Sequence, residues 1–262
     1  MQRSIDRILT THTGSLPRPD DLLEMLKEKE AGHPPAGFAD RVRAATAEIV
    51  RRQRAAGLDV VNDGEVGKPD YSTYIKNRLT GFDGPMEAHP MPRDARDFPE
   101  FFARNPTGNT TVTRPSCTGP IAWRDFDAVQ IDIANLRAAA AQSGASDVFM
   151  TAVSPGQAAR FMGNRFYPTH EAYLRALGAA LKREYDAIAH AGFVLQVDCP
   201  DLASGWNNQF AALSIAEFRK IVELHIDVLN EATRDVPAAQ LRLHLCWGNY
   251  PGPHNHDIPL AE

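Results

Sequence analysis

Two residues in the last part of the sequence, His244 and Cys246, have the types and the spacing of a pair of metal ligands. They lie in the segment Leu-Arg-Leu-His-Leu-Cys, residues 241–246, whose pattern is typical of a buried β-strand. Side chains two positions apart on a strand point to the same face. An imidazole nitrogen and a soft sulfur on one face suit a zinc ion. The pair alone leaves open a buried histidine that bonds to backbone, beside an inert core cysteine.

Two carboxylates, Asp198 and Glu65, stand where an apolar segment ends and a buried charge needs a partner or a ligand. Asp198 favours a ligand role, and its alternative is to cap the turn that follows. Glu65 comes two residues after Asp63, so we expect both to face one cavity. There one of them could bind an amino group or hold a proton. The alternative for this pair is a salt bridge to Lys68 or Arg78.

The segment Thr13-Gly14-Ser15 ends another predicted strand and offers backbone and hydroxyl groups for a substrate carboxylate. Its alternative is a simple turn. His12 could lie at the edge of the same site or be structural. His254 and His256 read as exposed loop histidines. Aromatic side chains are more often core than pocket, and those that could line one are Tyr71, Tyr74, Trp123, Trp206 and Trp247.

The elements that must position these residues alternate between strand and helix patterns. Helical spacing of apolar residues predicts helices over 20–29, 38–56, 125–143, 170–191 and 214–233. Short apolar runs predict strands over 8–16, 58–63, 110–114, 148–153, 193–198 and 241–246. A capping box of Ser214 and Glu217 marks the start of the last helix. Residues 81–109 lack periodicity and read as a long loop or excursion.

Repeated strand–helix units predict an α/β fold with a parallel sheet. The polar residues follow the strands, as they do at the catalytic face of a (β/α)8 TIM barrel. Six of eight units are recognisable, and a helix pattern that starts at Asp257 stops within one turn. We therefore expect a single catalytic barrel domain over 1–262, truncated at its C-terminus. No Gly-x-Gly-x-x-Gly motif follows the first strand, which argues against a dinucleotide-binding domain.

The composition is that of an ordinary globular enzyme, with 262 residues, 43% hydrophobic residues and a net charge of −5. No basic run predicts nucleic acid or a membrane surface as a partner. No stretch approaches the ~18 apolar residues of a membrane span. Three scattered cysteines do not form a disulfide framework, so the cytoplasm is the expected compartment. The oligomeric state is left open.

Four motifs taken together resemble the catalytic barrel of cobalamin-independent methionine synthase and its single-barrel relatives. This family lies within the uroporphyrinogen decarboxylase/methionine synthase-like barrel superfamily. The motifs stand in the family's order and each falls at a predicted strand end. They are Thr-Gly-Ser-Leu-Pro (13–17), Gly-Leu-Asp-Val-Val-Asn-Asp-Gly-Glu (57–65), Leu-Gln-Val-Asp-Cys-Pro-Asp-Leu (195–202) and His-Leu-Cys (244–246).

The resemblance implies a zinc-dependent methyl or alkyl transferase whose acceptor is a thiol, homocysteine or a similar compound. His244 and Cys246 would be the first two zinc ligands, and the remaining ligands are expected beyond residue 262. Ser15, within the Thr13–Gly14–Ser15 motif, would bind the substrate carboxylate, and the catalytic pair Glu65 and Asp198 would bind its ammonium group. Zinc would lower the pKa of the substrate thiol, so that a thiolate attacks the donor carbon.

Two other functions remain open at this point. One is a metal-free lyase of the uroporphyrinogen decarboxylase type, in which aspartates and arginines handle a carboxylated substrate. The other is a non-catalytic fragment. The sequence does not identify the alkyl donor or the thiol acceptor.

Overall fold

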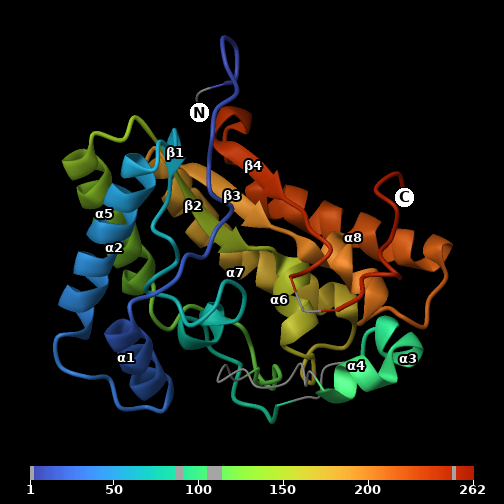
Figure 1. Ribbon diagram of the computed structural model, residues 1–262. Helices are drawn as coiled ribbons and strands as arrows, with labels where there is room; N and C mark the ends of the chain where they lie inside the picture. Colours follow the sequence, from blue (N-terminus) through green and yellow to red (C-terminus); the bar gives the residue numbers. More distant parts are fainter. Residues whose placement is uncertain (1–2, 87–90, 105–113, 250–251) are drawn as a thin grey trace.

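The computed structural model describes residues 3–86, 91–104, 114–249 and 252–262. A parallel sheet runs through its centre in the order β1–β2–β3–β4 (Figure 1). The strands are β1 Val60–Val61, β2 Asp147–Val153, β3 Val194–Asp198 and β4 Leu241–His244. Before β1, Thr11 forms an isolated parallel bridge with Val60, so the N-terminal segment runs beside that strand.

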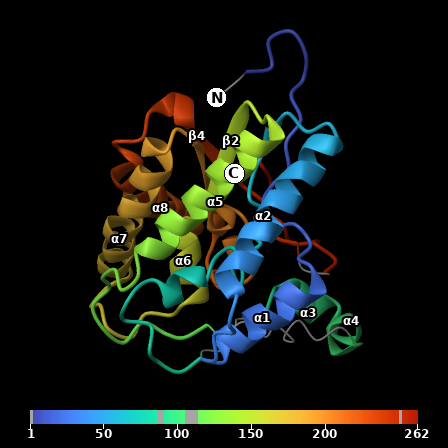
Figure 2. The ribbon, with the colours of Figure 1, turned by 90° about the vertical axis from the view of Figure 1, so that its left-hand side faces the viewer.

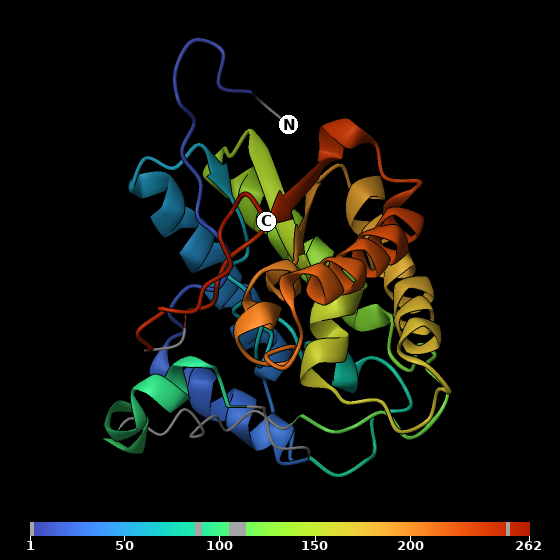
Figure 3. The ribbon, with the colours of Figure 1, turned by 90° about the vertical axis from the view of Figure 1, so that its right-hand side faces the viewer.

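Eight α-helices lie in the described residues. They are α1 Asp20–Glu30, α2 Phe38–Ala55, α3 Asp94–Asp97, α4 Pro99–Arg104, α5 Asp127–Ser143, α6 Pro155–Phe161, α7 His170–His190 and α8 Ile215–Thr233. Helix α2 packs against α5, and α7 packs against α8 (Figures 2 and 3). None of the described helices is both long and apolar enough to pass through a bilayer.

Alternation along β3 divides the protein into a core and a polar face. Leu195 and Val197 belong to the hydrophobic core that the helices cover. Gln196 and Asp198 are also buried, but they engage polar partners on the opposite face of the strand. Leu195 and Val197 thus pack the sheet against its helices, and Gln196 and Asp198 are available for chemistry.

The five helices and the strand patterns at 58–63, 148–153, 193–198 and 241–246 all correspond to elements of the structure. The predicted capping box is present, with the Ser214 hydroxyl accepting from the Glu217 amide at 3.3 Å. Of the strand predicted at 8–16, only the Thr11 bridge is regular. Residues 110–113 lie outside the described residues, and the described part of the predicted excursion contains α3 and α4. The parallel α/β arrangement is confirmed, whereas barrel closure and the number of units stay predictions.

The prediction that residues 241–246 form a buried strand is wrong. Among the described residues β4 pairs only with β3, which makes it an edge strand. Leu243 is 54% exposed and Leu245 is 36% exposed, so the apolar side of this segment has little covering it in the described structure. The pattern of leucines correctly indicated a strand, but it carries no information about what covers it.

Helix α6 approaches the segment after β3 so closely that only glycine fits at position 156. A Cβ atom there would overlap Asp201 Oδ2 and His225 Nδ1. These two atoms are joined by a buried hydrogen bond of 2.7 Å, and His225 Nε2 lies 3.0 Å from His170 Nε2. The contact fixes α6 against α8 next to the carboxyl end of β3.

We predict that Gly156→Ala lowers the free energy of unfolding by about 1–3 kcal/mol, because the new methyl group must displace Asp201 or His225. Urea denaturation of the two proteins measures this. Gly119→Ala is the matched control, since the nearest atom to its Cβ would be at 3.6 Å, an ordinary contact. Equal midpoints for wild type and Gly156→Ala would contradict the packing described.

Candidate functional site

A cleft of about 290 Å³ opens at the carboxyl ends of β3 and β4. Each residue that the sequence singled out for substrate or metal contributes to its wall, namely Thr13, Gly14, Ser15, Glu65, Asp198, His244 and Cys246. The rest of the lining is His12, Tyr71, Pro200, Gly248 and Asn249. Residues from four separate stretches of the sequence therefore meet at one cleft.

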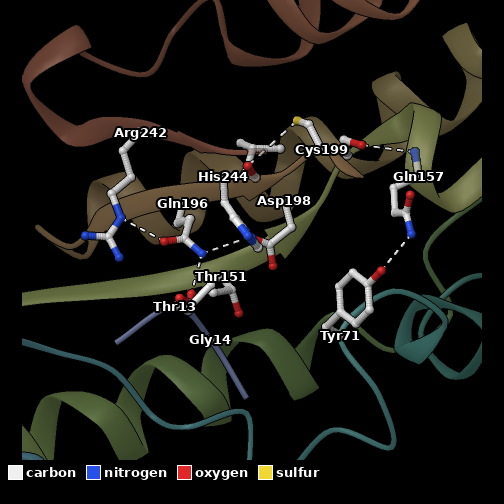
Figure 4. A network of polar contacts seen from close by, with 12 residues as sticks. Thr13, Gly14, Tyr71, Thr151, Gln157, Gln196, Asp198, Cys199, Arg242 and His244 are labelled. Carbon is white, nitrogen blue, oxygen red and sulfur yellow. Dashed lines mark hydrogen bonds and ion pairs between the residues drawn. The ribbon is translucent and has the colours of Figure 1, made fainter. Parts of the chain in front are cut away.

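The strand register explains why Asp198 meets His244. In the parallel ladder Asp198 is the partner of His244, and Gln196 is the partner of Arg242. Asp198 Oδ1 lies 3.0 Å from His244 Nδ1, and it accepts from Gln196 Nε2 at 2.8 Å (Figure 4). Gln196 Oε1 in turn accepts from Arg242 Nε at 2.8 Å. Arg242 thus holds Gln196, and Gln196 helps to hold the carboxylate.

The pKa of His244 is raised to about 10, first by its hydrogen bond to the Asp198 carboxylate and then by a hydrogen bond to Cys246. Because Nδ1 faces the carboxylate, Nε2 is the ring nitrogen left for another partner. A carboxylate that orients an imidazole in this way is a common arrangement behind metal-bound histidines. Cys246 is half-buried and free.

Glu65 is buried at the other side of the cleft and held by two hydroxyl groups. Its carboxylate accepts from Ser15 Oγ, and it accepts from Thr151 Oγ1 at 2.7 Å. Burial raises the pKa of Glu65, while the positive charge of Lys68 acts in the opposite direction. Lys68 Nζ donates to the backbone oxygen of Thr151 at 2.9 Å, and is itself buried. A Cβ on Gly14 would stand 2.9 Å from Glu65 Oε1, so the glycine makes room for this carboxylate.

The expectation that Asp63 and Glu65 face one cavity is wrong. The strand ends at Val61, and the backbone then turns through the left-handed region, with φ of 61° at Gly64 and 54° at Glu65. Asp63 accepts from the Glu65 amide at 2.9 Å and does not line the cleft. Left-handed backbone at a non-glycine residue costs energy and is common at functional sites.

Other candidates from the sequence lie elsewhere. Cys199 is buried with its sulfur 3.7 Å from the Val197 oxygen, on the core side of β3. His254 pairs with Asp257, and His256 pairs with Asp97, outside the cleft. Of the five aromatic residues only Tyr71 lines the cleft. Within the described ranges, no three His, Cys, Asp or Glu side chains gather closely enough to hold a metal ion.

Sequence reasoning missed Thr151, and it named Lys68 only as a possible salt-bridge partner of Asp63 or Glu65. Thr151 interrupts the apolar run of β2, and in the sheet it is the register partner of Gln196. A hydroxyl within an apolar strand, on the same face as two polar residues of the next strand, was the available signal. The burial of Lys68 and its bond to the Thr151 backbone oxygen were not predictable, because both depend on a turn whose shape the sequence pattern does not reveal.

Comparison with known proteins places the chain among relatives of one kind. No protein-family model matches it. The methionine synthase of Pyrococcus furiosus is 23% identical over 245 residues, which is 92% of this chain and 62% of that protein. The methionine synthase of Sulfolobus acidocaldarius is 25% identical over 253 residues, 95% of this chain and 64% of that protein. The chain thus spans a little over three fifths of these curated relatives.

Solved structures agree on the fold. A B12-independent methionine synthase from Shewanella sp. W3-18-1, in complex with selenomethionine, superposes with a TM-score of 0.67 at 20% identity over 91% of this chain and 61% of that chain. A putative vitamin-B12 independent methionine synthase from Listeria monocytogenes gives 0.62 at 19% identity, over 93% and 68%. Fold and cleft define a parallel α/β protein with its polar residues at the strand ends. More particularly, the chain is similar in sequence to curated methionine synthases and in fold to B12-independent methionine synthases, the resemblance that its motifs predicted.

We predict that Thr151→Val destabilises the protein in a pH-dependent way. The Thr151 hydroxyl favours the ionised form of Glu65, so its loss raises the already raised pKa of Glu65 further. The destabilisation is therefore smaller at acid pH, where Glu65 is protonated, and increases by about 1–2 kcal/mol as the pH rises and the carboxylate ionises. Urea unfolding between about pH 4.5 and pH 8 measures it.

Thr46→Val is the control for that experiment. Thr46 is equally buried, but its hydroxyl donates to the Val42 backbone oxygen at 2.9 Å, which does not titrate. Its effect should be independent of pH. A Thr151→Val effect that is also flat with pH would refute the coupling to Glu65.

Proposed function

We propose that this chain carries the thiol-alkylating site of a methionine synthase-like methyltransferase, with homocysteine or a similar amino-acid thiol as acceptor. The observation that carries the proposal is the meeting of all seven predicted residues at one cleft. The similarity to curated methionine synthases supports the reaction class. The donor is a methyl or other alkyl compound, and no nucleic acid or membrane is invoked.

The amino-acid end of the acceptor fits the polar wall of the cleft. Asp198 and Glu65 present carboxylates that would bind an ammonium group, and both are buried, which strengthens the attraction. The backbone of the Thr13–Ser15 segment and the Ser15 hydroxyl would bind the substrate carboxylate. For this the Ser15 hydroxyl must turn from Glu65, to which it donates in the structure. The incoming ammonium would then replace it as a partner of Glu65.

His244 and Cys246 have the chemistry of zinc ligands, an imidazole nitrogen and a sulfur side by side on one strand end. The described residues supply two donors, so a complete tetrahedral set would need others from outside them. If zinc is bound here, it would lower the pKa of the acceptor thiol. Asp198 would serve twice, by orienting His244 and by positioning the ammonium group.

The reaction proposed is a displacement at carbon. The acceptor sulfur forms a new bond to the methyl or alkyl carbon, and the bond between that carbon and the donor breaks, with its electron pair leaving on the donor. The chain's own contribution is to orient the acceptor through Asp198 and Glu65. Its three cysteines are free, which suits the reducing cytoplasm expected from the sequence.

We predict that Cys246→Ser removes zinc and thiol methylation together, because a serine hydroxyl is a poor zinc ligand. Metal analysis of the full-length protein and an assay with homocysteine measure the two effects. Cys199→Ala is the matched control: that cysteine is buried on the core side of β3, so zinc content and turnover should persist. Retained zinc and full turnover in Cys246→Ser would contradict the assignment of Cys246 as a zinc ligand.

We also predict that Asp198→Asn reduces the preference for a thiol that carries an amino group. The readout is the ratio of kcat/KM for homocysteine to that for 4-mercaptobutanoate, which lacks only the amino group. Loss of a charged hydrogen-bond partner should lower the ratio about 10- to 100-fold. Asp257→Asn, whose carboxylate pairs with His254 outside the cleft, should leave it unchanged. An unchanged ratio in Asp198→Asn would show that this carboxylate does not bind the ammonium group.

A further inference from the structure

Two arginines close to the cleft, Arg114 and Arg160, form no ion pair with any described carboxylate. Their guanidinium carbons lie 4.4 Å and 5.3 Å from the ring centroid of Phe161, so both cations stack on one aromatic side chain. The Nε of Arg114 is buried and lacks a hydrogen-bond partner among the described residues. Within the described ranges Arg160 donates only to neutral groups, on Gln157, Ser204 and Asn208.

This arrangement differs from that of the buried Arg78. Arg78 pairs with Asp132 at 2.5 Å and with Glu184 at 3.3 Å, which compensates its charge. The acid that acts most strongly on Arg114 is Asp70, but the oxygens of Asp70 already accept bonds from Ser72 and Thr73. Both arginines are partly buried. Holding two neighbouring cations partly out of water without a counterion is costly, so the pair lacks a negative charge that a ligand could bring.

A short chain of side chains connects the pair to the cleft. Arg160 Nη1 lies 3.3 Å from Gln157 Oε1, and Gln157 Nε2 donates to the Tyr71 hydroxyl at 2.8 Å. Tyr71 lines the cleft together with Asp198 and Cys246. In Figure 4, Tyr71 and Gln157 lie at the opposite end of the network from Thr13 and Arg242. The arginines therefore adjoin the side of the cleft away from the segment proposed for the amino-acid carboxylate.

We propose that Arg114 and Arg160 form an oxyanion subsite that binds an acidic group of the alkyl donor. This inference rests on the proposed function, because it assigns the second substrate of the same site. The guanidinium fork matches the oxygens of a carboxylate, sulfonate or phosphate, and stacking on Phe161 holds its plane. The acceptor already has its own polar groups, so the unmatched positive charge is available for the donor.

Direct binding tests the subsite without any need for catalysis. Isothermal titration of the full-length protein with acetate, methanesulfonate and phosphate, at constant ionic strength, should detect saturable binding of at least one of them and identify the preferred oxyanion. Arg114→Met and Arg160→Met should weaken that binding about ten-fold or more. Arg124→Met is the control. Arg124 is exposed, with its Nη2 3.8 Å from Asp83 Oδ1, so this variant should bind the oxyanion with the affinity of wild type.

Arg114→Met is the decisive variant, because the Arg114 side chain has no hydrogen bond to lose among the described residues and the variant should therefore fold. Absence of saturable binding in the wild type, or equal affinity in Arg114→Met, would overturn the subsite. In the methyl-transfer assay, Arg114→Met should raise the KM for the donor several-fold and leave zinc content and the KM for homocysteine unchanged. If no methyl transfer is found but arginine-dependent anion binding persists, the proposed function fails and the anion site stands.

Discussion

The parallel register between β3 and β4 is the constraint on which the cleft depends. It pairs Asp198 with His244 and Gln196 with Arg242, so that four polar side chains meet on one face of two adjacent strands. The backbone ladder continues past the side chains, with the Cys199 amide donating to the His244 oxygen at 2.8 Å. Because side-chain direction alternates along a strand, a slip of one residue would turn Asp198 toward the helices and bring Cys199 into the cleft.

A second group of contacts holds the opposite wall. Glu65 sits on a left-handed turn and would be unstable as a buried charge without its neighbours. The hydroxyls of Ser15 and Thr151 and the charge of Lys68 favour its ionised form. The N-terminal segment, the turn after β1 and the middle of β2 therefore act together on one carboxylate. One wall thus carries Asp198 with His244 and Cys246, and the opposite wall carries Glu65.

Much of this could be predicted from the sequence, and the failures have physical causes. The sequence pattern correctly brought Asp198, His244 and Cys246 to one cleft, because β3 is regular to Asp198, β4 is regular to His244, and Cys246 follows closely after the strand end. The same rule failed for Asp63 and Glu65, because the strand had already ended and a left-handed turn rotated the side chains. Leucines in 241–246 predicted a strand but not its exposure. The meeting of Arg114 and Arg160 at the Phe161 ring was not predictable from the sequence, because it depends on how α6 lies against the rest of the fold.

One contact in the floor of the cleft joins parts of the chain that are far apart. Gln196 Nε2 donates to the backbone oxygen of Thr13 at 2.6 Å, across a separation of 183 residues. Closing so long a loop is entropically costly and slows folding. During synthesis from the N-terminus, the contact between Ser15 and Glu65 can form early, whereas Gln196 and Arg242 emerge much later. The polar floor of the cleft can therefore be completed only after β3 and β4 have left the ribosome.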